Sequence, residues 1–234
     1  MQHNETFTPS LTKIQENTLM RSVYNWMMLG LFISGLTAFL GSNSSSIQRL
    51  IFGNPYMLWV LFFVEIGLVI AISGGINRMA ASTASGLFLL FSFVNGLTLS
   101  SILLVYTSAS VASAFFITGL TFGTMSVYGY FTKTDLTSWG QFLFMGLVGI
   151  IIASVVNFFL HNAMMDWIIS FIGVFIFVGL TAYDTQKIRR LGERMSSADG
   201  EQFSKLAVVG ALSLYLDFIN LFLMFLRFFG RGRD

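Results

Sequence analysis

The sequence predicts an all-α, polytopic membrane protein built as a bundle of seven transmembrane helices. Of its 234 residues, 55% are hydrophobic and only 10% are charged, whereas a soluble domain carries about 25% charged residues. The mean hydropathy is +0.75. The apolar residues gather in seven segments, each close to the roughly 20 residues that a helix needs to cross a bilayer.

The seven predicted helices follow one another with short polar connections. They cover approximately residues 23–40, 56–76, 85–106, 111–131, 142–160, 167–188 and 206–228. The clearest breaks are a serine-rich loop at 41–46, the residue Pro55 and the polar stretch 192–204.

These segments divide the chain into three parts. We predict a polar N-terminal tail (1–22), a seven-helix transmembrane domain (23–228) and a short C-terminal tail (229–234). The N-terminal tail does not have the pattern of a cleavable signal peptide, so we expect the first helix to direct membrane insertion.

The distribution of Lys and Arg predicts the orientation of the bundle. Cytoplasmic loops are enriched in these residues, and the connection between the last two helices holds five of them: Lys187, Arg189, Arg190, Arg194 and Lys205. We therefore expect the N-terminus and this connection to lie in the cytoplasm. Three arginines near the C-terminus argue the other way, but an odd number of helices cannot place both ends on one side.

Composition also disfavours several classes of function. The formal net charge of +2, without a basic cluster, gives no reason to expect nucleic-acid binding. The absence of Cys excludes disulfides and thiolate metal sites. His3 and His161 are isolated, so we find no credible Ser/His/Asp grouping or His metal motif. We expect a protein that is not an enzyme and that carries no cofactor, apart from weakly bound Ca²⁺.

Two aspartates inside apolar segments are the leading candidates for function. Asp184 follows a long run of Val, Ile, Phe and Leu, and Asp217 is flanked by apolar residues on both sides. An ionised carboxylate is costly in hydrocarbon, so such residues usually face the bundle interior and find a partner. The simpler alternative is that each aspartate bonds separately to polar neighbours, for example Thr181, Ser213 and Asn220.

Helix arithmetic permits the two aspartates to meet. Asp184 lies about 7 Å from Arg189 at the inner edge, and Asp217 lies about 18 Å beyond Lys205 along the next helix. They share a depth if the last helix begins outside the bilayer. Two adjacent buried carboxylates cannot both ionise cheaply, so the pair would share a proton. Such a pair would be a latch, held together by the proton and repulsive once the proton leaves.

Arg78 is the predicted third member of this group. It closes the second helix at the inner edge, on the side where Asp184 is expected. A guanidinium close to the pair would favour ionisation of the carboxylates. The alternative is that Arg78 is an ordinary cytoplasmic anchor.

A second polar layer is predicted farther out. Glu65 lies about 20 Å outward from Arg78, and Arg227 lies about 15 Å outward from Asp217. These spacings suggest an ion pair between Glu65 and Arg227. Alternatively, Glu65 is protonated and bonded to an asparagine, Asn95 or Asn157.

The segments around the aspartates resemble a known family. GLTAYDTQKIRR around Asp184 and ALSLYLDFINLFLMFLRFFG around Asp217 are similar to signature segments of the transmembrane Bax inhibitor motif family, in its bacterial inner-membrane branch. The resemblance extends over the whole hydrophobic body. It implies a seven-helix fold with the last helix central, and a pH-sensitive calcium leak. Asp184 and Asp217 match the proton sensor of the family, and Arg78 matches an arginine that ends its second helix.

The function expected from the sequence is a pH-gated cation leak channel of the bacterial inner membrane, with calcium as the expected ion. Asp184, Asp217 and Glu65 would offer Ca²⁺ a small set of oxygen ligands, so binding should be weak. The partners would be the lipid bilayer and the calcium ion. An alternative is a regulatory protein that acts through its N-terminal tail on a membrane-protein partner, such as a protease or a stress-response complex. A proton-coupled transporter would need broken helices, which the sequence does not show.

Overall fold

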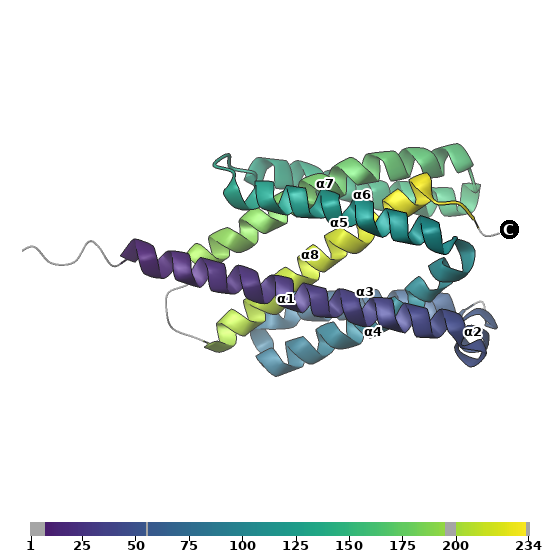
Figure 1. Ribbon diagram of the computed structural model, residues 1–234, viewed down its shortest axis with the longest axis horizontal. Coiled ribbons are helices and arrows are strands. Elements are labelled where there is room, and N and C mark those ends of the chain that lie inside the picture. Colours follow the sequence, from purple (N-terminus) through teal and green to yellow (C-terminus); the bar gives the residue numbers. More distant parts are fainter. Residues whose placement is uncertain (1–7, 55, 195–199, 233–234) are drawn as a thin grey trace, which may run out of the picture. The chain divides into compact units, whose positions relative to one another are not determined.

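The computed structural model describes residues 8–54, 56–194 and 200–232. Within these ranges the chain forms eight α-helices and one 3₁₀ turn (Figure 1). Seven helices are long and apolar enough to cross a membrane, and their candidate spans are Glu16–Asn43, Met57–Arg78, Ala81–Val105, Ser108–Phe131, Thr137–Leu160, Ala163–Arg194 and Gly200–Phe229. The prediction of an all-α bundle with seven spans is confirmed.

Helix α1 (Thr8–Asn43) begins well inside the region predicted as a polar tail. Its candidate span starts only at Glu16. The difference has a simple cause, because hydropathy detects the part of a helix that suits lipid and does not detect a polar extension of the same helix.

Helix α2 (Ser45–Phe52) occupies part of the sequence predicted as a serine-rich loop. Ser44 caps it, since its Oγ accepts a hydrogen bond from the backbone N–H of Ile47 at 3.5 Å. Ile47 and Ile51 lie one turn apart, and Ile51 is buried. A short amphipathic helix of this kind is too brief to be recognised by the hydropathy of a membrane span.

The chain forms two compact units. The first consists of Met1–Val105 and Ile188–Tyr215, and the second of Tyr106–Lys187 and Leu216–Asp234. The first unit holds α1, α2, α3 (Met57–Gly75), the 3₁₀ turn η1 (Ile76–Arg78) and α4 (Ala81–Val105). The second holds α5 (Ser108–Phe131) and α6 (Thr137–Leu160). Helices α7 (Ala163–Arg194) and α8 (Gly200–Phe229) contribute residues to both units.

In the first unit, α1 and α3 pack against α4 (Figure 1). The approach of α1 to α4 is close at Gly96, where a Cβ atom would lie 2.6 Å from the carbonyl oxygen of Ser34. The fully buried ring of Tyr215, from α8, makes edge contacts with Phe88 and Phe91 at centroid distances of 6.0 and 5.4 Å. These aromatic contacts form the centre of the first unit.

In the second unit, α5 and α7 meet backbone to backbone at Gly129. A Cβ atom at Gly129 would overlap the carbonyl group of Ala182, so only glycine permits this contact. Phe218 of α8 packs edge-on against Phe115 and Phe122 of α5, with ring centroids 5.5 Å apart in each case. The packing positions the neighbouring residues Asp184 and Asp217 within one unit.

Helix α8 is the most buried of the seven candidate spans. Of its most apolar stretch, 67% is buried, against 6% to 39% for the corresponding stretches of the other six. This burial agrees with the predicted central position of the last helix.

Candidate functional site

The structure places both predicted sensor aspartates in the second unit. Asp184 lies on α7 and Asp217 lies on α8. Asp217 is only 5% exposed, and Asp184 is half-buried. The two carboxylates act on each other electrostatically. The fold therefore brings together the two carboxyl groups that the sequence singled out, so that the charge of one affects the other.

One carboxylate oxygen of this pair has no hydrogen-bond donor. Oδ2 of Asp217 is fully buried and accepts no hydrogen bond from the part of the chain that the structure describes. Leaving a buried acceptor unsatisfied costs about 1–3 kcal/mol, and more if the group is charged. This oxygen is therefore the position at which a proton or a cation is needed most.

The alternative, separate bonding of each aspartate to polar neighbours, gains no support from the contacts. The hydroxyl of Thr181 donates to the carbonyl of Phe177 at 2.8 Å, within α7. The amide of Asn220 donates to the carbonyl of Leu216 at 2.8 Å, within α8. These two side chains thus direct their recorded hydrogen bonds to their own helices and not to Asp184 or Asp217.

Lys187 is a cation whose charge acts on both aspartates, and the sequence did not predict this role. It lies one turn after Asp184 on α7, and its charge acts on Asp184 and on Asp217. Its ammonium group is 5.9 Å from the centroid of the Tyr183 ring. The spacing of three residues from Asp184 was a usable signal, since such residues are neighbours on a helix surface.

Gln186 joins the C-terminal part of α7 to the connection between α5 and α6. Its Oε1 accepts from the backbone N–H of Leu136 at 2.9 Å, and its Nε2 donates to the carbonyl of Thr134 at 2.8 Å. Gln186 is 1% exposed, and its bond to Leu136 is buried, whereas its bond to Thr134 is partly buried. This anchor lies two residues from Asp184 and restrains the backbone that carries it.

Arg78 ends the 3₁₀ turn η1 of the first unit. It closes the second candidate span, as the sequence indicated. Its action on the aspartate pair, which belongs to the second unit, stays a prediction.

Glu65 has hydrogen-bond partners on the neighbouring helix. Asn95 Nδ2 donates to Glu65 Oε2 at 3.1 Å, and the hydroxyl of Thr98 donates to Glu65 Oε1 at 2.6 Å. The network continues to Tyr215, whose hydroxyl donates to Asn95 Oδ1 at 2.8 Å and lies 2.6 Å from Ser34 Oγ. These contacts support an asparagine partner for Glu65, namely Asn95, and the protonation of Glu65 stays a prediction.

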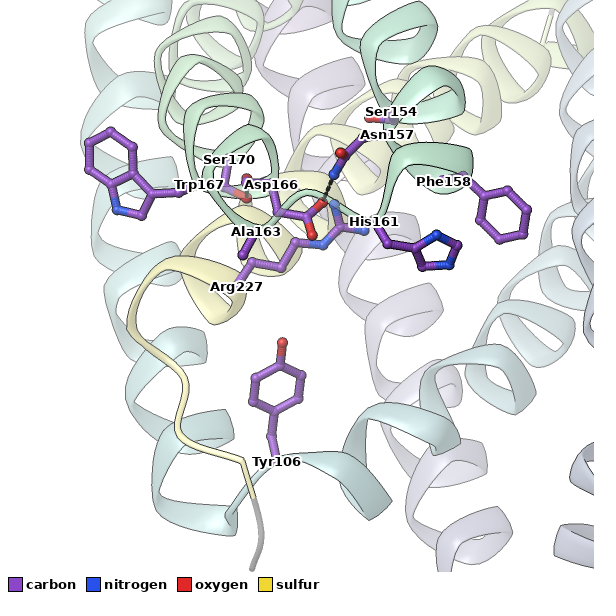
Figure 2. Close-up of a pocket in the computed structure, with 10 residues that line it drawn as sticks. All are labelled: Tyr106, Ser154, Asn157, Phe158, His161, Ala163, Asp166, Trp167, Ser170 and Arg227. Atoms are coloured by element: carbon purple, nitrogen blue, oxygen red, sulfur yellow. Dashed lines mark hydrogen bonds between the residues drawn. The ribbon is translucent and has the colours of Figure 1, made fainter.

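The predicted ion pair between Glu65 and Arg227 gains no support from these contacts. Both carboxylate oxygens of Glu65 accept hydrogen bonds from α4 in the first unit. Arg227 belongs to the second unit, where it lines a pocket and points toward Asp166 (Figure 2). Each residue thus has polar neighbours of its own.

The predicted calcium ligands are Asp184 and Asp217 in the second unit and Glu65 in the first unit. Among the described residues, no three His, Asp or Glu side chains form a group that could hold a metal ion. The oxygens of Glu65 accept hydrogen bonds from Asn95 and Thr98, and the binding of Ca²⁺ by Asp184, Asp217 and Glu65 stays a prediction.

Comparison with known protein families supports the resemblance found in the sequence. The family described as "Inhibitor of apoptosis-promoting Bax1" matches residues 16–234, which include all seven candidate spans and both aspartates. The chain belongs to this Bax inhibitor family. The family membership suggested by the two aspartate segments is thereby confirmed, and the match covers almost the whole chain.

Relatives in the Bax inhibitor family are found in distant bacteria. The inner membrane protein YbhL of Escherichia coli is 48% identical over 92% of each chain. An uncharacterized protein of Borreliella burgdorferi is 47% identical over 94% of each chain. An uncharacterized membrane protein of Streptococcus pyogenes is 35% identical over 92% of this chain and 93% of its own. With the seven candidate spans, these relatives identify the chain as a multi-pass protein of the bacterial inner membrane.

Proposed function

We propose that this Bax inhibitor family protein is a pH-sensitive calcium leak channel, and not an enzyme, and that Asp184 and Asp217 form its proton-operated gate. The observation that carries the proposal is the buried Oδ2 of Asp217, which lacks a hydrogen-bond donor in the described chain while its carboxylate interacts with that of Asp184. A shared proton satisfies this oxygen and joins α7 to α8.

The charge of the pair changes when the proton is lost or gained. Two ionised carboxylates repel each other, and Lys187 offsets only part of that repulsion because its own side chain is exposed. The balance between a closed and an open arrangement of α7 and α8 therefore depends on pH. A packed helix pair with two arrangements converts this local change into gating.

The same groups support calcium as the permeating ion. Carboxylate oxygens suit Ca²⁺, but two side chains provide far fewer than its usual six to eight oxygen ligands. The ion would keep most of its water while passing, so binding should be weak, as a leak requires.

Calcium flux into proteoliposomes, measured across a pH series, tests the proposal. We expect flux from the native protein to depend on pH, and the variants Asp184→Asn and Asp217→Asn each to lose most of that dependence. The double variant should add little more, because the pair acts as one unit. Asp135→Asn is the matched control, since Asp135 is exposed and should leave the pH profile unchanged. Fully additive effects of the two changes, or no calcium flux at any pH, would contradict the proposal.

A tail deletion separates this function from the alternative of a regulator that acts on a protein partner. Helix α1 begins at Thr8, so removal of residues 1–7 leaves the helix intact. A channel gated by Asp184 and Asp217 should keep its flux and its pH profile in this variant.

A further inference from the structure

A cavity at one end of the second unit, lined by polar and apolar side chains, is not used by the proposed gate. It has a volume of about 680 Å³, within the roughly 300–1,000 Å³ typical of small-molecule sites. All its lining residues belong to the second unit. They come from the end of α6, the start of α7, the end of α8 and the turn before α5 (Figure 2). Because these helices are membrane spans, their common end lies at a boundary between lipid and water.

The cavity contains one acidic and one basic side chain. Asp166 and Arg227 point toward one another (Figure 2), without forming an ion pair in the described part of the chain. Arg227 is exposed. A ligand that places a negative group at Arg227 and a positive group at Asp166 would satisfy both charges at once.

The acidic side is held in place by a buried amide. Asn157, which is 4% exposed, donates from Nδ2 to Asp166 Oδ1 at 2.7 Å. The same amide also donates to the carbonyl of Asn162 at 3.1 Å, and its Oδ1 accepts from the backbone N–H of Asn162 at 3.1 Å. His161 adopts a left-handed backbone conformation (φ 50°) that ends α6 and turns the chain toward α7. The Asp166 carboxylate is thus preorganised by a built turn, with its other oxygen available to a donor.

The cavity is flanked by exposed aromatic side chains of the kind found at membrane interfaces. Trp167 is 52% exposed and Phe158 is 54% exposed. Trp167 stacks on Phe171 at a centroid distance of 5.4 Å and contacts Phe228 at 5.4 Å. Trp and Tyr gather at the headgroup level of a bilayer, and the hydroxyl of Tyr106 points into the cavity from below (Figure 2).

We propose that this cavity binds the headgroup of a phospholipid that carries both a phosphate and a primary ammonium group, as phosphatidylethanolamine does, with the phosphate on Arg227 and the ammonium on Asp166. The planar guanidinium can donate two parallel hydrogen bonds to a phosphate. A primary ammonium donates hydrogen bonds to a carboxylate. The exposed rings of Trp167 and Phe158 provide apolar surface for the acyl chains on either side.

Other headgroups fit the cavity less well. A purely anionic headgroup would bring a second negative charge to Asp166, and a bare cation would meet the charge of Arg227. A quaternary ammonium has no N–H group to donate, and its usual site is a cage of aromatic faces. Figure 2 shows the rings of Trp167 and Phe158 on opposite sides and directed away from Asp166, so they form no such cage.

Thermal unfolding of the purified full-length protein in detergent, with dioleoyl lipids added one at a time, tests the proposal. Phosphatidylethanolamine should raise the unfolding temperature more than phosphatidylcholine or phosphatidylglycerol. Arg227→Gln and Asp166→Asn should each weaken its apparent affinity by about tenfold, because each removes one charge-assisted interaction. Arg49→Gln is the matched control, since Arg49 is an exposed arginine of α2 outside the cavity, and it should retain the response.

A competition experiment on the unmodified protein keeps the proposal testable if a variant does not fold. Water-soluble glycerophosphoethanolamine should reduce the effect of phosphatidylethanolamine at high concentration, whereas glycerophosphoglycerol should not. Equal responses to the three lipids, or an unchanged response in Arg227→Gln, would overturn the proposal. Equally tight binding of the soluble headgroup alone would show that the ligand is a free zwitterion and not a lipid.

Discussion

Replacement of Asp217 by asparagine should stabilise the protein while it removes the pH response. Asp217 Oδ2 is a buried acceptor without a donor in the described chain, and its carboxylate faces the negative charge of Asp184. Asparagine has nearly the same shape, carries no charge and brings an N–H group that can donate to Asp184. A residue that costs stability in this way is typical of a functional position.

The size of the effect follows from the unsatisfied oxygen. An unsatisfied buried oxygen costs about 1–3 kcal/mol. At a pH where the native aspartate pair has lost its shared proton, Asp217→Asn should be more stable than the native protein by this amount. For a chain of this length, 1 kcal/mol corresponds to a shift in unfolding temperature of about 2–4 °C. We therefore expect an increase of several degrees that is largest at the pH where the native pair is fully ionised.

Thermal unfolding in detergent, followed across a pH series, measures this effect. The control is Asp135→Asn, a change at an exposed aspartate, which should stay within about 0.5 kcal/mol of the native protein. A loss of stability in Asp217→Asn at every pH would refute the reasoning, because it would mean that the carboxylate makes favourable contacts which the amide cannot replace.

Three further predictions concern the packing that supports the polar groups. Tyr215→Phe keeps the ring contacts but removes a hydroxyl that bonds within the Glu65 network. It should lower the free energy of unfolding by about 1–2 kcal/mol in thermal unfolding, whereas Tyr24→Phe should change it little. Gln186→Leu removes two hydrogen bonds to the α5–α6 connection, one of them buried, and should accelerate proteolysis of that connection. Gly129→Val forces α5 away from α7 and should abolish folding, as judged by expression and size-exclusion profile; the same change at Gly123, which has open space around it, should be tolerated.

The number and type of the helices could be predicted because each span is a long apolar run bounded by polar residues. The boundaries were less accessible where a helix continues beyond the membrane, as α1 does toward Thr8, or is short and amphipathic, as α2 is. Hydropathy shows whether a segment suits lipid or water, and a helix can continue from one environment into the other.

The aspartates of the site could be predicted because a charge in an apolar run is conspicuous. The partners of buried polar groups were harder to predict, since they depend on which helix faces meet. The sequence suggested Arg227 as the partner of Glu65, whereas Asn95 donates a hydrogen bond to Glu65 in the structure. It did not suggest Lys187, whose charge acts on both aspartates. The action of Arg78 on the aspartates stays a prediction. Tyr215 carried no warning at all, because a tyrosine flanked by apolar residues usually belongs to a core, and only the fold shows that its hydroxyl is bonded.

The C-terminal segment has a practical consequence for anyone who attaches a tag or a reporter to this protein. Its backbone pairs with the turn before α5: Tyr106 and Gly232 form an antiparallel bridge, Thr107 N–H donates to the carbonyl of Arg231 at 3.2 Å, and Arg231 N–H donates to Ser110 Oγ at 2.9 Å. A bulky group attached shortly after Gly232 would disturb this pairing, close to the cavity that Tyr106 lines. Fusions at the N-terminus, ahead of Thr8, avoid this perturbation and are the better choice for flux and lipid-binding measurements.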